Sequence, residues 1–237
     1  QSDEKFKART LGQSVVNDAH LVSRTFVRIG ALPKDNATVH EAKDSFNNCT
    51  FEGIRRLFVQ TAKSVGREGL FVFHFSGHGI RVGDDQWGLA PSDFDYSDRA
   101  YITASVLNDW LTEANCKAKH VLFTLDCCYA GGIGDALAST DMSYRSVFIV
   151  SSCTANESSY AINTLGHSVF SYFFTYAMKK CMKRDAEETE LDVGHRSSFS
   201  IALQTIFIEC HTCSEALSSL LVKYVGQYNE HAVAKNA

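Results

Sequence analysis

The sequence lacks several features that would place it in a special class of protein. No apolar run in its 237 residues approaches the roughly 18 that a membrane helix needs, and no signal peptide is visible at its start. Lys and Arg (23) are fewer than Asp and Glu (27), so no broad basic field favours nucleic acid or an anionic membrane as a partner. Internal repeats and low-complexity tracts are also missing. We therefore expect a soluble protein.

The chain also lacks the regular cysteine framework of a small secreted domain. Its eight cysteines are scattered, and several lie within apolar runs, which is typical of reduced, buried thiols. A cytoplasmic location is therefore expected. Cys210 and Cys213 have a C-x-x-C spacing, but no second pair of ligands follows at a spacing that suits zinc.

The length and composition suit a single domain, residues 1–237. With 45% hydrophobic residues, the chain can bury the core of one large α/β domain. Because it begins with Gln1 rather than Met, we expect it to be a fragment of a longer protein.

Apolar periodicity predicts an alternation of helices and strands, which favours a mostly parallel sheet with right-handed crossovers. Residues 1–13 show no strand-like run, and 199–208 is ambiguous between strand and helix. The expected helices are 17–30, 50–66, 103–114, 170–180 and 212–225; the expected strands are 38–43, 70–75, 121–125 and 146–152; a hairpin is expected at 87–93 and loops at 133–144 and 181–196.

Two of these strands end in residues that carry chemistry. The apolar run Val121–Leu125 leads into Asp126-Cys127-Cys128, and the run Leu70–Phe75 leads into Ser76-Gly77-His78-Gly79. Ligands of an open parallel sheet sit at the carboxyl ends of its strands. A thiol and an imidazole are therefore expected at the same edge of the sheet.

Such a pair is what covalent cysteine catalysis requires. An imidazole can take the thiol proton, or stabilise the thiolate, and later protonate the leaving amine. The pleat of a strand points adjacent side chains to opposite faces, so only one of Cys127 and Cys128 can face His78. The competing interpretation is that each is a buried structural residue, which we favour for Cys49, Cys116, Cys153 and Cys181.

These residues resemble motifs of the caspase, metacaspase and paracaspase superfamily of cysteine peptidases. Phe73–Gly79 is similar to the histidine motif of that superfamily, and Asp126–Gly132 to the metacaspase form of its cysteine motif; the histidine precedes the cysteine by fifty positions, from 78 to 128. The resemblance covers about residues 17–180. It implies a three-layer sandwich, a mostly parallel sheet with helices on both faces, made of a large-subunit-like part (about 1–140) and a small-subunit-like part (about 145–237).

The resemblance also assigns roles to single residues. Cys128 would be the nucleophile and His78 the general acid/base, while the backbone N–H groups of Gly77 and Cys128 would form the oxyanion hole. The family's first strand would lie where residues 1–13 show no strand-like run, and its last edge strand is not visible before Ala237.

The same matching predicts an acidic substrate pocket. Asp126, Asp18, Ser76 and, by likeness to paracaspases, Glu157 would bind the substrate residue before the scissile bond. Carboxylates that converge favour a guanidinium or ammonium and disfavour Asp. The alternative is that Asp18 caps its helix and that Glu157 is a solvated loop acid.

We therefore predict a cysteine endopeptidase that cleaves after Arg or Lys, in regulated proteolysis or in cell-death or immune signalling. Partners would be peptide or protein substrates, with a homodimer and adaptor or sensor regions outside the chain left open. Two alternatives stay open: a catalytically silent regulatory or scaffold module of the same fold, and a peptidase with Asp specificity.

The chemistry itself requires no metal or other cofactor, although an acidic group leaves calcium open as an activator: Asp84, Asp85, Asp93, Asp95 and Asp98. If the chain cleaves itself, we expect cleavage after Lys183 or Arg184, in the charged segment 181–196.

Overall fold

A computed structural model describes residues 12–29, 37, 49–95, 100–142, 145–162 and 164–188, with side chains up to Lys179. The chain divides into two compact units, residues 1–171 and 172–237, and helix α5 (Val169–Glu188) begins in the first. The elements that carry the candidate site all lie in the first unit.

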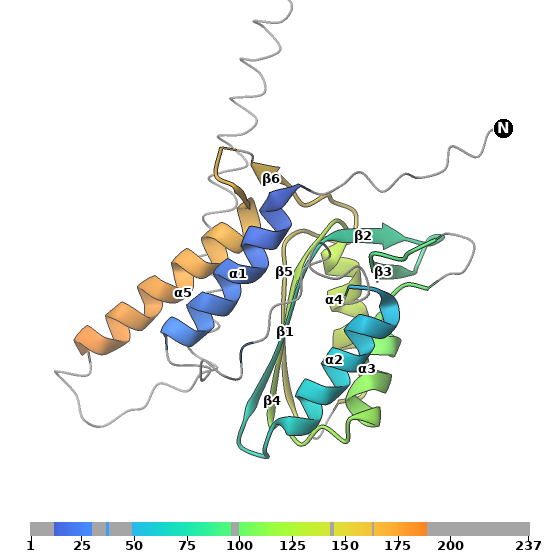
Figure 1. Ribbon diagram of the computed structural model, residues 1–237, viewed down its shortest axis with the longest axis horizontal. Helices are drawn as coiled ribbons and strands as arrows, with labels where there is room; N and C mark the ends of the chain where they lie inside the picture. The colour runs from blue at the N-terminus through green and yellow to red at the C-terminus, as the bar shows by residue number, and fades with distance from the viewer. Residues whose placement is uncertain are drawn as a thin grey trace, which may run out of the picture. The chain divides into compact units, whose positions relative to one another are not determined.

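A parallel three-stranded sheet forms the centre of this unit (Figure 1). Its strands are β1 (Leu70–Ser76), β4 (His120–Asp126) and β5 (Ser146–Ser151), in the order β1-β4-β5. They coincide with the three apolar runs that predicted buried strands, because a strand covered on both faces can be apolar throughout.

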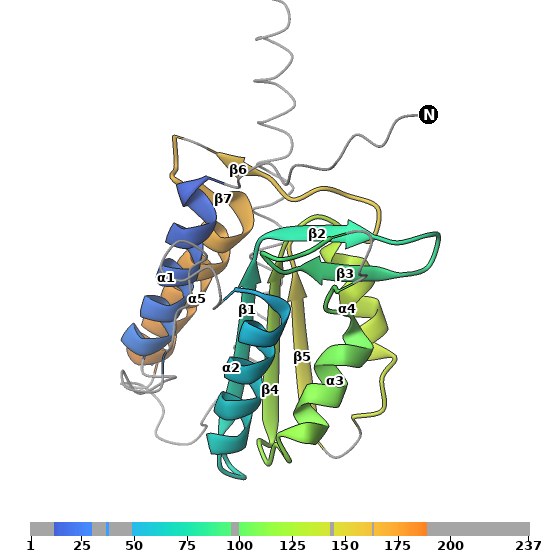
Figure 2. The same cartoon turned by 45° about the vertical axis from the view of Figure 1, so that its right-hand side comes forward.

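Two antiparallel pairs of short strands accompany the sheet. β2 (His78–Arg81) pairs with β3 (Trp87–Ala90) directly after β1, and β6 (Ala161–Ile162) pairs with β7 (His167–Ser168) after β5. Both pairs follow the carboxyl end of a central strand, so they lie at the edge where the site was expected (Figure 2).

Helices cover both faces of the sheet, as the three-layer prediction requires. α2 (Phe51–Ser64) and α3 (Ala104–Glu113) lie on one face, and α1 (Gln13–Arg28) lies on the other (Figures 1 and 2). Threonines cap two of them as N-caps do: Thr50 Oγ1 accepts the Gly53 N–H at 3.1 Å, and Thr103 Oγ1 accepts the Val106 N–H at 3.2 Å.

The pleat divides the strand residues between these two faces. Phe71 and Phe73 of β1 pack on Phe58 of α2, with ring centroids 4.9 and 5.3 Å apart, and Val121 of β4 joins the same apolar core. Each large apolar side chain buried in this way contributes about 1.5–3 kcal/mol. The alternate residues of β1 and β4 point to the face that α1 covers, which explains why polar side chains there can meet.

Four expected boundaries were wrong. The hairpin expected at 87–93 is formed by β2 and β3 instead, so it spans residues 78–90. α1 begins at Gln13 rather than at residue 17. The expected loop 133–144 starts within α4 (Ala130–Ala138), where Ile133 and Leu137 are buried at helical spacing; the preceding glycines had hidden this helix. α5 continues through 181–188, which the charge pattern had assigned to a loop, because this stretch contains good helix formers and neither Gly nor Pro.

Other expectations fall outside the described residues: the strand at 38–43, the segment 199–208, the helix at 212–225, the C-x-x-C pair, the residues before 12, and Asp98. Within the part of the chain that is described, no helix is both long and apolar enough to cross a membrane.

Candidate active site

The two chemistry-bearing strand ends lie side by side. β1 and β4 run parallel in a register that places Ser76 opposite Asp126, and the ladder continues with a hydrogen bond from Gly77 N–H to the Asp126 carbonyl oxygen at 3.1 Å. His78 and Cys128 each stand two positions beyond this pair. The fold therefore brings the imidazole and the thiol to one edge of the sheet, as the strand pattern predicted.

Gly79 brings the histidine hairpin against the cysteine loop. A Cβ atom at this position would lie 1.8 Å from the carbonyl oxygen of Cys128 and 3.1 Å from the Cys127 sulfur. No other residue can approach the Cys128 peptide so closely without moving the backbone. Position 79 therefore requires glycine on steric grounds. Gly79 packs β2 directly against the residue expected to be the nucleophile.

The environments of Cys127 and Cys128 differ sharply. Cys127 is 1% exposed and belongs to the apolar core on the α2 face. Burial, and then the nearby Asp126 carboxylate, raises the pKa of its thiol well above the usual range, so Cys127 stays protonated and inert. Cys128 is only partly buried, and its Sγ lies 4.0 Å from the Ser159 carbonyl oxygen. Of the two, Cys128 is the accessible thiol.

The chain turns abruptly after Cys128. Tyr129 has a φ of +61°, in the left-handed region, and its N–H donates to the Glu157 carbonyl oxygen at 2.8 Å before α4 begins at Ala130. A non-glycine residue in this conformation is uncommon and is held by its surroundings. The turn leaves Cys128 between the end of β4 and the start of α4.

Asp126 is buried and fully engaged by serine hydroxyls. It is 4% exposed, Ser159 Oγ donates to its Oδ1 at 2.9 Å, and Ser168 and Ser171 both donate to Oδ2, the latter at 2.6 Å. Burial raises the pKa of Asp126 to about 6, although the hydroxyl donors oppose this rise. The carboxylate is therefore maintained by hydrogen bonds in an environment that disfavours its charge.

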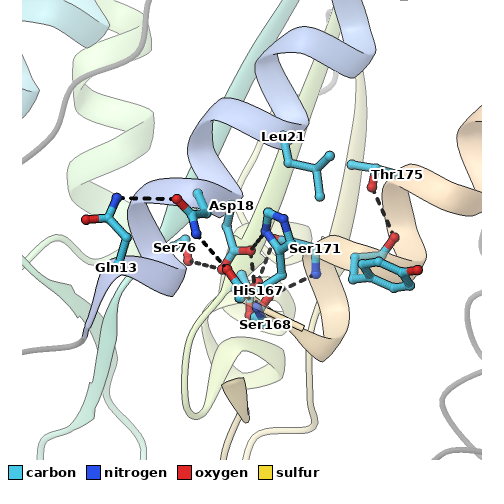
Figure 3. A network of polar contacts seen from close by, with 12 residues as sticks. Gln13, Asp18, Leu21, Ser76, His167, Ser168, Ser171 and Thr175 are labelled. Atoms are coloured by element: carbon cyan, nitrogen blue, oxygen red, sulfur yellow. Dashed lines mark hydrogen bonds and ion pairs between the residues drawn. The ribbon is translucent and has the colours of Figure 1, made fainter. Parts of the chain in front are cut away.

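Asp18 reaches the same place from α1 (Figure 3). It is 0% exposed; its Oδ1 lies 3.0 Å from His167 Nδ1, and its Oδ2 accepts from Ser76 Oγ at 3.3 Å. The Ser168 N–H donates to both of its oxygens, at 3.1 and 3.2 Å. Burial raises the pKa of Asp18 above its usual range, while His167 and Ser168 oppose the rise. Asp18 sits inside α1, so it does not cap that helix.

Ser168 joins the two acids. Its backbone N–H bonds Asp18 and its hydroxyl bonds Asp126, so one residue of β7 connects α1 to the end of β4. Three of the four expected pocket residues, Asp18, Ser76 and Asp126, thus belong to one network. Nothing in the sequence indicated Ser159, Ser168 or Ser171, because isolated serines far along the chain form no pattern. His167, next to Ser168, could at most have been noted as a titratable residue.

Glu157 does not belong to this network in the contacts described. Its side chain is exposed, and its Oε2 accepts the Thr154 N–H at 2.9 Å, which lowers the pKa of the carboxyl group. This matches the alternative interpretation of a solvated loop acid, although the backbone carbonyl of Glu157 does hold Tyr129, next to Cys128.

Two of the acidic residues considered for calcium have partners within the chain. Asp93 Oδ1 accepts the Phe51 N–H at 2.8 Å, and Asp84 Oδ1 lies 3.9 Å from an Arg81 nitrogen. Among the residues whose side chains are described, no three His, Cys, Asp or Glu side chains gather as metal ligands would. Calcium dependence remains a prediction that these residues do not test.

Comparison with known proteins agrees with this arrangement. A family model described as the caspase domain of peptidase family C14 matches residues 4–217, which is most of the chain. No individual curated protein matches the sequence. The parallel sheet with helices on both faces is consistent with that fold. The chain therefore belongs to the caspase-domain family of cysteine peptidases.

Proposed function

We propose that this chain is a cysteine endopeptidase that cleaves peptide bonds after Arg or Lys, with Cys128 as nucleophile and His78 as general acid/base. The observation that carries the proposal is the parallel register of β1 and β4, in which Ser76 faces Asp126 and the two reactive side chains follow at equal spacing. The burial of Cys127 and the accessibility of Cys128 support the choice of nucleophile.

The reaction follows from these two groups. His78 takes the proton of Cys128, and the thiolate attacks the carbonyl carbon of the scissile bond to form a tetrahedral intermediate. The imidazolium then protonates the leaving amine as the C–N bond breaks, which gives a thioester. Water, deprotonated by His78, hydrolyses the thioester and restores the thiol.

The developing oxyanion needs preorganised N–H donors, and Gly77 and Cys128 remain our candidates. The Gly77 N–H now bonds the Asp126 carbonyl oxygen, so it could serve only if that ladder bond opened. The other candidate donor, the Cys128 N–H, belongs to the nucleophile itself and does not require that this hydrogen bond open.

The acidic network supports specificity for a basic residue. Asp18 and Asp126 are two carboxylates linked through Ser168, with Ser76 beside them, and a guanidinium can bond two carboxylates at once. Both acids are buried, so a substrate side chain would have to replace hydroxyl donors of the serines. Desolvated acids discriminate strongly against an Asp substrate because like charges repel most where water is excluded.

One observation favours the second candidate, a regulatory module without turnover. The hydrogen bonds of Asp18 and Asp126 are already supplied by residues of the chain itself, as expected if the two acids only stabilise the fold. The same assay separates the two candidates.

The experiment measures release of a fluorophore from short peptides ending in Arg, Lys or Asp, with and without calcium, by the wild type and its Cys128→Ala and Cys127→Ala variants. We expect turnover after Arg or Lys that is lost only in Cys128→Ala, by on the order of 10³-fold or more. Turnover only after Asp would refute the proposed specificity for Arg and Lys, but it would not contradict Cys128 as the nucleophile. Absence of turnover under every condition would favour the regulatory module.

The cellular setting is part of the proposal. We place the peptidase in the cytoplasm, in regulated proteolysis connected with cell death or immune signalling, with protein substrates that carry a basic residue before the cleaved bond. If it cleaves itself, the expected positions, Lys183 and Arg184, lie in the last two turns of α5, where cleavage requires that the helix unwind locally. A single intact band after incubation with active enzyme would exclude self-cleavage.

A further inference from the structure

A third thiol lies beside the nucleophile loop. Cys153 follows β5, and the β4–β5 ladder continues beyond the strands with a hydrogen bond from Ser152 N–H to the Leu125 carbonyl oxygen at 2.9 Å. The Cys153 thiol donates to the Cys127 carbonyl oxygen at 3.3 Å. That oxygen belongs to the peptide bond that joins Cys127 to Cys128. The Cys153 sulfur therefore touches the backbone immediately before the nucleophile.

The same sulfur also lies close to the backbone after the nucleophile. Cys153 Sγ is 3.4 Å from the Glu157 carbonyl oxygen, and this oxygen accepts the N–H of Tyr129 at 2.8 Å. At Gly131, a Cβ atom would lie 2.8 Å from the Cys153 carbonyl oxygen, so the start of α4 packs tightly on the Cys153 loop. Contacts on both sides of Cys128 thus hold Cys153 in place.

Cys128 and Cys153 follow neighbouring strands of the sheet. Leu125 and Ser151 are partners in the β4–β5 register, and neighbouring strands lie about 4.8 Å apart. Cys153 stands two positions beyond Ser151, and Cys128 stands three positions beyond Leu125. Disulfides join Cα atoms about 4.4–6.8 Å apart, and both cysteines stand in the short segments that follow these paired strands.

The thiols also influence one another electrostatically. Burial chiefly raises the pKa of Cys153, and a charge on Cys128 raises it further, while backbone N–H groups of Ala130 and Tyr129 oppose the rise. Cys153, and to a smaller extent Cys128, likewise contribute to the raised pKa of Cys127. A charge on one of these thiols therefore disfavours ionisation of the others. Cys128, the accessible member of the pair at the end of β4, is the one that can react first.

We propose that Cys128 and Cys153 form a reversible oxidation site, at which a hydroperoxide oxidises Cys128 and Cys153 then closes a disulfide that blocks the nucleophile. The inference rests on the proposed role of Cys128 as the reactive thiol. It assigns a function to Cys153, which the sequence alone presents as a core cysteine.

Both steps balance. The Cys128 thiolate attacks one oxygen of hydrogen peroxide, the O–O bond breaks, and the product is a sulfenic acid with hydroxide, which a proton converts to water. The Cys153 sulfur then attacks the sulfenic sulfur; the S–O bond breaks, and the departing hydroxide leaves as water with the Cys153 proton. Two thiols lose two electrons in all, the peroxide gains them, and a dithiol reductant reverses the change by exchange.

The experiment uses the reduced full chain treated with hydrogen peroxide, followed by an alkylating agent and peptide mapping by mass spectrometry without reduction. We expect two fewer alkylated thiols among the eight, a peptide pair cross-linked between Cys128 and Cys153, and loss of the cross-link on treatment with dithiothreitol. Where the wild type turns over peptides, turnover should fall with the cross-link and return after reduction.

Two variants sharpen the test. In Cys153→Ser the cross-link should be absent, Cys128 should advance to the sulfinic acid, and reduction should no longer restore turnover. Cys49→Ser, a partly buried cysteine elsewhere in the chain, serves as the matched control and should behave as the wild type does. A Cys127–Cys128 cross-link that persists in Cys153→Ser would overturn the assignment, as would sulfinic acid at Cys128 in the wild type without any cross-link.

The outcomes also separate this inference from the proposed function, because mapping does not require turnover. A Cys128–Cys153 cross-link in a chain that cleaves no peptide would support the oxidation site and refute the peptidase. Cleavage after Arg or Lys without the cross-link would support the peptidase and refute the oxidation site.

Discussion

Two acids that the sequence placed in one substrate pocket, Asp126 and Glu157, occupy opposite environments in the structure. Asp126 is buried, accepts three serine hydroxyls, and has a raised pKa because burial penalises its charge. Glu157 is exposed, accepts one backbone N–H, and has a lowered pKa because that hydrogen bond favours its charge. The ionised carboxylate of Asp126 therefore depends on hydrogen bonds from neighbouring side chains, whereas the ionised carboxylate of Glu157 is stabilised by water.

The difference shows where specificity can come from. A substrate cation that reaches Asp126 exchanges hydroxyl donors for an opposite charge where water is excluded, and such interactions are strong. A cation beside Glu157 would find a carboxylate that water already solvates, and exposed ion pairs contribute little. We therefore propose that Asp126 and Asp18, and not Glu157, discriminate between basic and acidic substrates.

The largest expected effect is kinetic. Asp126→Asn should lower kcat/KM for Arg peptides by on the order of 10²- to 10³-fold, because a buried charge opposite the substrate cation is lost. Glu157→Gln, the same change from acid to amide at the exposed site, should change kcat/KM by less than about twofold. Steady-state kinetics on both variants, with circular dichroism to verify the fold, test the contrast.

Equal losses of kcat/KM in Asp126→Asn and Glu157→Gln would contradict this contrast and would indicate that Glu157 also lines the substrate pocket. No loss in Asp126→Asn would mean that Asp126 serves the fold alone.

The next effect concerns pH and stability. The pKa of Asp126 is raised from 3.8 to about 6, so the folded state holds its proton more tightly than the unfolded state does. Its stabilising contribution is complete below about pH 4 and is lost as the pH rises to about 6, by about 3 kcal/mol. The free energy of unfolding of the wild type, minus that of Asp126→Asn, should fall over this range when both are unfolded in urea.

The subtraction is needed because His74 acts in the opposite direction. Burial lowers its pKa to about 4, so its contribution to stability is lost as the pH falls from about 6.5 to 4. The wild type alone would therefore show a flattened profile. A difference that rises with pH, or stays constant, would contradict the raised pKa of Asp126.

A smaller effect is expected among the serines. Ser168→Ala should lower the free energy of unfolding by about 1–3 kcal/mol, because a buried carboxylate loses a donor that water cannot replace. Ser159→Ala should cost less than about 1 kcal/mol, since Ser159 is only partly buried and water can take its place. Urea titrations of the two alanine variants compare them directly, and an equal cost would show that burial does not decide the value of these bonds.

The contrast between Asp126, at the end of a strand, and Glu157, in a loop, also explains what the sequence could predict. Apolar runs located β1, β4 and β5, and a parallel sheet places their carboxyl ends together, so His78, Cys128 and Asp126 could be brought to one edge from the pattern alone. The pleat also separated Cys127 from Cys128 in principle, although only the packing of Cys127 in the apolar core decided which thiol is accessible.

The hydroxyl network could not be predicted in this way. Ser168 meets Asp18 across 150 positions of the chain, and its neighbours in sequence carry no periodic or charged signal that fixes where its hydroxyl points. The left-handed turn at Tyr129 was hidden for a similar reason, because a non-glycine residue gives no sign of a positive φ. Contacts that depend on loop conformation, as at Glu157, need the folded structure.

The smallest expected effect is at Glu157 itself. Glu157→Ala removes the carboxylate that accepts the Thr154 N–H, but both groups are exposed and water can bond that N–H, so the free energy of unfolding should change by no more than about 0.5 kcal/mol. Thermal or urea unfolding of this variant beside Ser168→Ala provides the measurement. A cost equal to that of Ser168→Ala would mean that the loop carrying Glu157 supports the Cys128 turn through its side chain. Because the Tyr129 N–H bonds the backbone carbonyl of Glu157, which alanine retains, we expect that support to survive the substitution.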